Sequence, residues 1–122
     1  MVYILNGISV TMFSDFPVNI VIDRISNDEV IELVNKAGKE NVTAVINRKN
    51  VAQDVSNLLD IPINMSKKKI SLEKSYFTPD SKDGDTVIIA RQIPSTEKVD
   101  DRLIIPKRPR IEFFIVDILD FL

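Results

Sequence analysis

The pattern of apolar and polar positions predicts strands near both ends of the chain and two helices between them. An unbroken apolar run over Val2–Leu5 predicts a buried strand. Alternation over Val18–Arg24 predicts a second strand with one face well buried. Further strands are predicted over Lys69–Glu73, Thr86–Ile93 and Arg110–Val116. The short apolar stretch Val42–Ile46 fits either a strand or the approach to a helix.

Two segments carry the period of amphipathic helices. Ser26 stands three residues before Glu29, which is the spacing of a capping box, and a helix is predicted to follow over Asn27–Lys36. Asn47 is a suitable N-cap for a second helix over Arg48–Leu59. The apolar faces of the two helices are Val30, Ile31, Leu33, Val34 and Ala37, and then Val51, Ala52, Val55, Leu58 and Leu59.

The number and kind of the predicted elements indicate an α+β fold. Five strands and two helices predict an α+β domain with a mixed five-stranded sheet. Proline, glycine and polar residues predict a loop or hairpin turn over Ser75–Asp85 and irregular structure over Ser95–Pro109. Neither a repeat nor an internal boundary interrupts the pattern, so residues 1–122 are expected to form a single domain.

The amino-acid composition excludes several kinds of catalytic and metal site but says little more about the fold. The chain has no histidine and no cysteine, which excludes imidazole acid–base catalysis, thiolate metal sites and disulfides. Neither a metal nor another cofactor is therefore expected. The formal net charge of −2 does not indicate a strongly electrostatic nucleic-acid binder, so double-stranded DNA is not an expected partner. No apolar run approaches the roughly 20 residues that span a bilayer, and no signal peptide is indicated.

The first candidate site is the segment that follows the first predicted strand. Asn6, Gly7, Ser9 and Thr11 are small or polar residues within six positions. Small side chains after a buried strand let a ligand approach the backbone closely, so this segment is a candidate binding loop. The alternative is a plain turn.

The second candidate is the start of the second predicted helix. Free backbone N–H groups and the positive end of the helix dipole favour an anion there. Asn47 precedes two cations, Arg48 and Lys49, which oppose the dipole and suit a phosphate contact instead. The alternative is that two exposed basic residues are tolerated at small cost.

Short motifs along most of the chain resemble the small proteins of crenarchaeal viruses that include the viral ring nucleases. Those are type III anti-CRISPR proteins that bind and cleave cyclic tetra-adenylate. The resemblance rests on Tyr3–Met12 with Phe16 and Pro17, on Ala44–Ile46, on Val51–Leu59, on Met65–Lys67 with Ile70, on Ile89–Pro94, and on the phenylalanines of the last strand.

The resemblance implies a homodimer in the host cytoplasm, in which each mixed sheet is flanked by helices. Cyclic oligoadenylate is expected to lie across the dimer interface. A four-nucleotide ring suits a two-fold pocket, because each subunit presents the same groups to half of the ring. Carried over position by position, the ligand contacts fall on Asn6, Ser9, Thr11, Lys67 and Ile70, and an arginine near the scissile phosphate falls on Gln92 or Arg91.

The chain departs from the family where catalysis takes place. The family's glycine–histidine pair is replaced by Asn47 and Arg48, and its glutamate by Ser95, with Glu97 two residues further on. A guanidinium hardly deprotonates at neutral pH, so Arg48 is a poor general acid, although it can stabilise developing negative charge. Any cleavage would be metal-independent, with Arg48, Lys49 and Glu97 as the candidate catalytic residues.

The sequence therefore predicts a cyclic-oligoadenylate-binding protein like the viral ring nucleases, with weakened or lost cleavage. An alternative is a non-enzymatic viral module of the same fold that binds protein or DNA. A third possibility is a structural or interaction protein.

Overall fold

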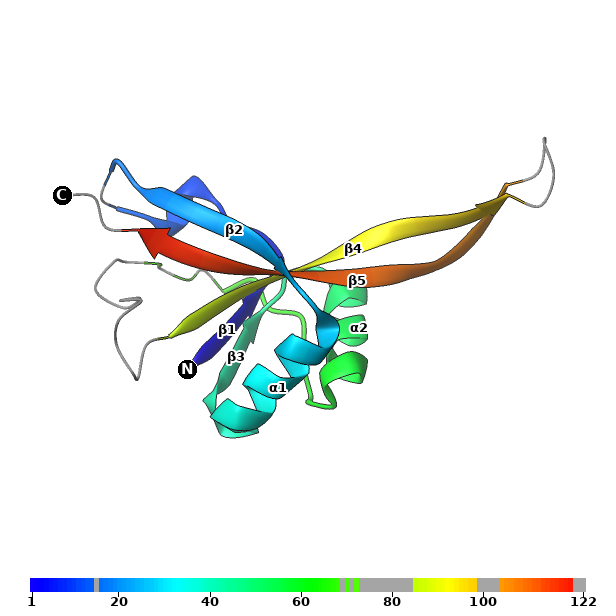
Figure 1. Cartoon of the computed structure of the whole chain (residues 1–122), viewed down its shortest axis with the longest axis horizontal. Coiled ribbons are helices and arrows are strands. Elements are labelled where there is room, and N and C mark those ends of the chain that lie inside the picture. Colours follow the sequence, from blue (N-terminus) through cyan, green and yellow to red (C-terminus); the bar gives the residue numbers. More distant parts are fainter. Residues whose placement is uncertain (15, 69, 71, 73–84, 99–103, 120–122) are drawn as a thin grey trace.

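The computed structural model describes residues 1–14, 16–68, 70, 72, 85–98 and 104–119, with the side chains of 94–98, 104–109 and 119 left out. The described residues form five strands and two helices (Figure 1). The strands are β1 (Val2–Leu5), β2 (Asn19–Ile25), β3 (Val42–Val45), β4 (Thr86–Lys98) and β5 (Ile104–Leu119). The helices are α1 (Asn27–Ala37) and α2 (Lys49–Leu59), with 3-10 turns η1 (Val10–Met12) and η2 (Lys39–Asn41).

The strands form one mixed sheet in the order β2-β5-β4-β1-β3. β1 is parallel to both neighbours, and its Leu5 lies opposite Val45 of β3 and Ile89 of β4. β5 is antiparallel to β4 and to β2. The predicted α+β class with a mixed five-stranded sheet is confirmed. The ambiguous stretch after α1 is a strand, β3.

Both helices pack on the same face of the sheet and bury their apolar stripes there. The capping box before α1 is present: the Ser26 Oγ accepts from the Glu29 backbone N–H at 3.1 Å and donates to the Glu29 carboxylate at 3.0 Å. The core under the helices contains Ile4, Val30, Val34, Val55, Ile88 and Phe113, all at most 1% exposed.

The other face of the sheet is covered at one end by the segment between β1 and β2. Met12 and Phe13 pack there against the buried Leu5 and Val87. Leu72 is fully buried in the same cluster, and its backbone N–H donates to the Met12 carbonyl at 2.7 Å. This cover brings the segment after β1 and the segment after α2 together.

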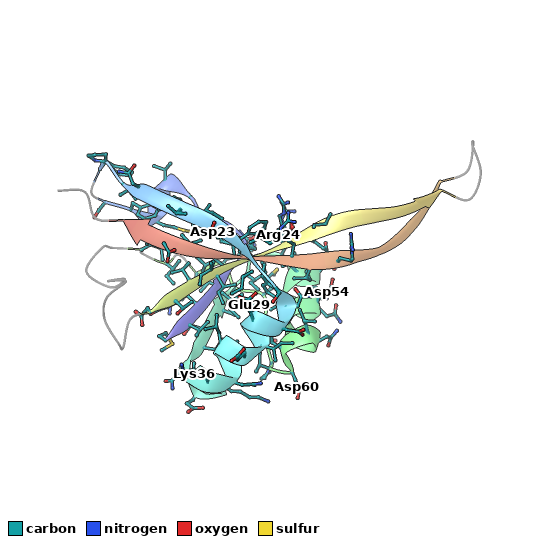
Figure 2. The ribbon with its side chains drawn as sticks, viewed as in Figure 1. Asp23, Arg24, Glu29, Lys36, Asp54 and Asp60 are labelled. Atoms are coloured by element: carbon teal, nitrogen blue, oxygen red, sulfur yellow. The ribbon has the colours of Figure 1, made fainter. Side chains whose placement is uncertain are left out.

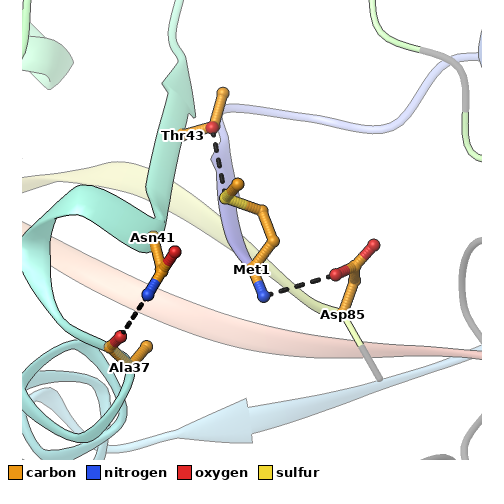
Figure 3. A network of polar contacts seen from close by, with 5 residues as sticks. All are labelled: Met1, Ala37, Asn41, Thr43 and Asp85. Atoms are coloured by element: carbon orange, nitrogen blue, oxygen red, sulfur yellow. Dashed lines mark hydrogen bonds and ion pairs between the residues drawn. The ribbon is translucent and has the colours of Figure 1, made fainter. Parts of the chain in front are cut away.

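The amino ends of β1 and β3 are tied at the opposite end of the sheet (Figure 3). The Met1 ammonium lies 3.3 Å from an Asp85 carboxylate oxygen, and the Thr43 hydroxyl donates to the Met1 sulfur at 3.4 Å. The Asn41 side chain donates to the Ala37 carbonyl at 2.8 Å and closes the turn between α1 and β3. The carboxyl ends of these strands are left open to other contacts.

Two strand predictions need correction. The strand predicted over Lys69–Glu73 is not formed at Ile70 and Leu72; its other residues lie outside the described part. The predicted second strand has no well-buried face, because β2 is an edge strand and Ile22 is 47% exposed. Apolar alternation reports which positions share a face, but not whether a neighbouring element covers that face.

The irregular structure predicted over Ser95–Pro109 is wrong. β4 and β5 continue past the rest of the sheet as a two-stranded ribbon that pairs as far as Lys98 and Ile104 (Figure 1). The register shifts around Pro94, where one residue of β4 faces two of β5. Each strand of an isolated ribbon has a free outer edge, so prolines without an N–H can be accommodated there. The loop predicted over Ser75–Asp85 lies almost entirely outside the described residues.

Candidate ligand site

The carboxyl ends of β1 and β3 place two asparagines side by side. Because the strands are parallel and in register, the residues that follow Leu5 and Val45 leave the sheet at the same edge. The Asn6 amide donates to the Asn47 side-chain oxygen at 2.6 Å, and the Asn6 oxygen accepts from the Asn47 backbone N–H at 3.3 Å. The two segments are thereby joined 41 positions apart in sequence.

A cavity of about 290 Å³ opens beside this pair. Its lining consists of Asn6, Gly7, Ser9, Thr11, Met12, Val45, Asn47, Ser66, Lys67, Lys68 and Ile70. Seven of these were named from the sequence as ligand-binding residues. Three separate segments therefore meet at this cavity. The other four lining residues, Met12, Val45, Ser66 and Lys68, were not named from the sequence as ligand contacts.

Local hydrogen bonds hold the walls of this cavity. The Ser9 side chain accepts from the Thr11 backbone N–H at 3.2 Å, and the two hydroxyl oxygens lie 2.8 Å apart. The Ser66 backbone N–H donates to the Ile46 carbonyl at 2.8 Å and fastens the basic segment to the end of β3. At Gly7 no atom other than those of the glycine and its two chain neighbours lies within 4 Å of where a Cβ would stand, so the backbone there is open to a ligand.

The start of α2 borders the same edge and carries unneutralised positive charge. Arg48, not Asn47, is the N-cap, and it makes no side-chain capping bond. The predicted cap is wrong because the Asn47 side chain is bonded to Asn6 instead. The first turn of α2 contains no acidic residue. Arg48, Lys49, Asn50, Val51 and Gln92 line a second cavity of about 350 Å³.

Four exposed cations gather around the two cavities: Arg48, Lys49, Lys67 and Lys68. Among the described residues, no acidic side chain forms an ion pair with any of them. Unpaired cations beside free helix N–H groups form an environment that favours phosphate. The same described part of the chain holds no cluster of acidic residues suited to a metal ion.

The structure distinguishes Gln92 from Arg91, the two residues on which the family's arginine could fall. Arg91 points to the face away from the helices, where its Nε and a terminal nitrogen contact Glu112 at 2.9 and 2.8 Å and its guanidinium lies 5.0 Å from the centre of the Phe114 ring. Gln92 is on the helix face and lines the cavity at the start of α2. Gln92 is therefore brought to the candidate site and Arg91 is not.

Glu97 belongs to the ribbon, opposite Ile105. It lies five residues beyond Gln92 along β4, roughly 17 Å at the usual rise of a strand. Within its own subunit, Glu97 is thus set apart from Arg48 and Lys49. Its side chain is outside the described part.

Comparisons with known proteins agree with this fold. The sequence pattern of the STIV B116-like family matches residues 2–91. The structure is similar to that of B116 of Sulfolobus turreted icosahedral virus, with a TM-score of 0.62 and 14% sequence identity, over 95% of this chain and 97% of that one. No curated protein sequence matches. Among the described helices, none is long and apolar enough to cross a membrane.

Proposed function

Because this chain belongs to the STIV B116-like family of viral proteins, we propose that it binds a cyclic oligoadenylate at the edge formed by β1, β3 and α2. The proposal rests on the cavity of about 290 Å³ beside Asn6 and Asn47. Residues chosen from three distant segments of the sequence, Asn6 to Thr11, Asn47 and Lys67 with Ile70, line one space. A plain turn after β1 does not require the other two segments to be there.

The charge of the site suits a ring of phosphodiesters. Lys67 lines the cavity beside Asn6 and Asn47, and Arg48 lines the neighbouring cavity at the start of α2. In a two-fold dimer these residues supply four cations for the four phosphates of cyclic tetra-adenylate. Asn6, Ser9 and Thr11 add the neutral donors and acceptors that ribose and base edges use. Binding of this kind weakens as salt rises.

A homodimer completes the proposed site. A cyclic ligand with two-fold symmetry is matched by two identical half-sites facing one groove. The ribbon of β4 and β5 favours association as well. A two-stranded ribbon is marginally stable alone in water, and a second copy of the chain would give it a surface to pack on.

Cleavage by this protein is proposed to be slow or absent. In ring opening, a ribose 2′-oxygen attacks the adjacent phosphorus as its proton leaves. The bond from phosphorus to the 5′-oxygen breaks, and that oxygen takes up a proton. Protonating the leaving oxygen by a general acid contributes about 10²–10⁴-fold to the rate. Arg48 does not supply that proton readily, so positioning and charge stabilisation would remain.

Titration with labelled cyclic tetra-adenylate, followed by analysis of the products, tests the proposal. We expect saturable binding at low salt by a dimeric protein, with little or no linear product. Light scattering at micromolar protein gives the oligomeric state. Absence of binding in low salt would reject the proposal, leaving the alternative of a viral interaction module for protein or DNA.

A further inference from the structure

The amide of Gln92 is held in one orientation by a carboxylate on α2. The Gln92 Nε2 donates to the Asp54 Oδ2 at 2.9 Å, and both side chains are half-buried. An ionised carboxylate only accepts hydrogen bonds, so the nitrogen must be the atom that faces Asp54. Figure 2 shows Asp54 on α2 where this helix approaches the sheet.

This orientation leaves the Gln92 oxygen as the free polar atom. The Oε1 lies on the other arm of the planar amide and has no hydrogen-bond partner among the described residues. Gln92 shares its cavity with Arg48 and Lys49, whose side chains offer only donors, and with Asn50, whose amide offers both a donor and an acceptor. The oxygen is therefore an acceptor placed among groups that suit phosphate.

We propose that the Gln92 oxygen accepts a hydrogen bond from a ribose 2′-hydroxyl, and that Asp54 is the residue that positions it. The inference rests on the proposed function. In a nucleotide, the 2′-hydroxyl is the donor nearest the 3′-phosphate, so it lies beside any phosphate bound at the start of α2. An arginine has no acceptor atom and would read the phosphate, whereas glutamine reads the sugar. The site then selects ribonucleotide rings over deoxyribonucleotide rings.

The test compares the affinity for cyclic tetra-adenylate with that for its 2′-deoxy counterpart. One hydrogen bond corresponds to a preference of about three- to tenfold for the ribose ring in the wild type. Gln92→Met keeps the shape of the side chain but lacks the acceptor. We expect it to abolish the preference, because the ribose ring loses the acceptor that distinguishes it from the deoxy ring.

Asp54 takes part in a further interaction, so its role is isolated by combining the variants. Asp54→Asn can donate to the Gln92 oxygen and turn the amide, so we expect the preference to fall toward one. In the Gln92→Met background the same change should have no effect on the preference. Asp60→Asn is the matched control, because Asp60 is a fully exposed carboxylate at the end of α2. Asp54→Ala removes the acceptor without adding a donor and gives a second measurement.

Each outcome decides a separate point. A wild type that binds neither ring overturns the proposed function together with this inference. Equal affinity of the wild type for both rings overturns the inference and leaves the proposed function standing. A preference that survives Gln92→Met assigns the sugar contact elsewhere, and one that survives both Asp54 variants removes the positioning role of Asp54.

Discussion

Restoring the family's acid–base pair at the start of α2 should raise the rate of cleavage. The perturbation is the double substitution Asn47→Gly with Arg48→His. Arg48 is exposed and makes no capping bond, so histidine at this position disturbs no capping hydrogen bond. An imidazole can donate its proton at neutral pH, which a guanidinium cannot.

The expected gain in cleavage rate is set by two opposing effects, the added general acid and the lost hydrogen bond of Asn47. A general acid contributes about 10²–10⁴-fold. Removing the Asn47 side chain breaks its 2.6 Å bond with Asn6, and one hydrogen bond is worth about 0.5–1.5 kcal/mol, or up to roughly tenfold in affinity. The net expectation under saturating ligand is a rate increase of about 10²-fold or more. Ser95→Glu is the third change, and it restores the missing carboxylate.

Single-turnover assays with excess protein separate the chemical step from binding. Arg48→His alone is the control that leaves the link between Asn6 and Asn47 intact. A wild-type rate equal to that of the double variant would refute the reasoning, because it would show that another group already protonates the leaving oxygen. Lys49 and Glu97 would then be the first residues to replace.

Three further predictions concern affinity and stability. Lys67→Ala should weaken binding of cyclic tetra-adenylate and flatten its salt dependence, whereas Lys36→Ala, an exposed cation in the last turn of α1, should do neither in the same titration. Phe113→Ala should lower the free energy of unfolding by about 3–5 kcal/mol in a urea titration, because the ring is fully buried between the helices and the sheet; a loss below 1 kcal/mol would contradict this packing. Ser26→Ala should cost about 1 kcal/mol in the same assay through loss of the α1 cap, and an unchanged midpoint would show that the capping box contributes nothing.

Local pattern predicted the helices well because their signals are contained in a few neighbouring residues. Ser26 and Glu29 specify the start of α1 through a bond between residues three positions apart. The apolar stripes of α1 and α2 predicted the faces that become buried. The predicted cap at Asn47 failed for the opposite reason. Its side chain has a partner, Asn6, that lies 41 positions away and is brought near only by the pairing of β1 with β3.

The sequence by itself determined the class of the fold, the two helices and most of the residues of the candidate site. What only the tertiary structure decided is which of these residues meet. Strand alternation sends Arg91 and Gln92 to opposite faces, and only the position of α2 shows that Gln92 has the candidate site beside it. The ribbon of β4 and β5 was equally hidden, because two consecutive strands can stay paired past prolines wherever each strand keeps a free outer edge.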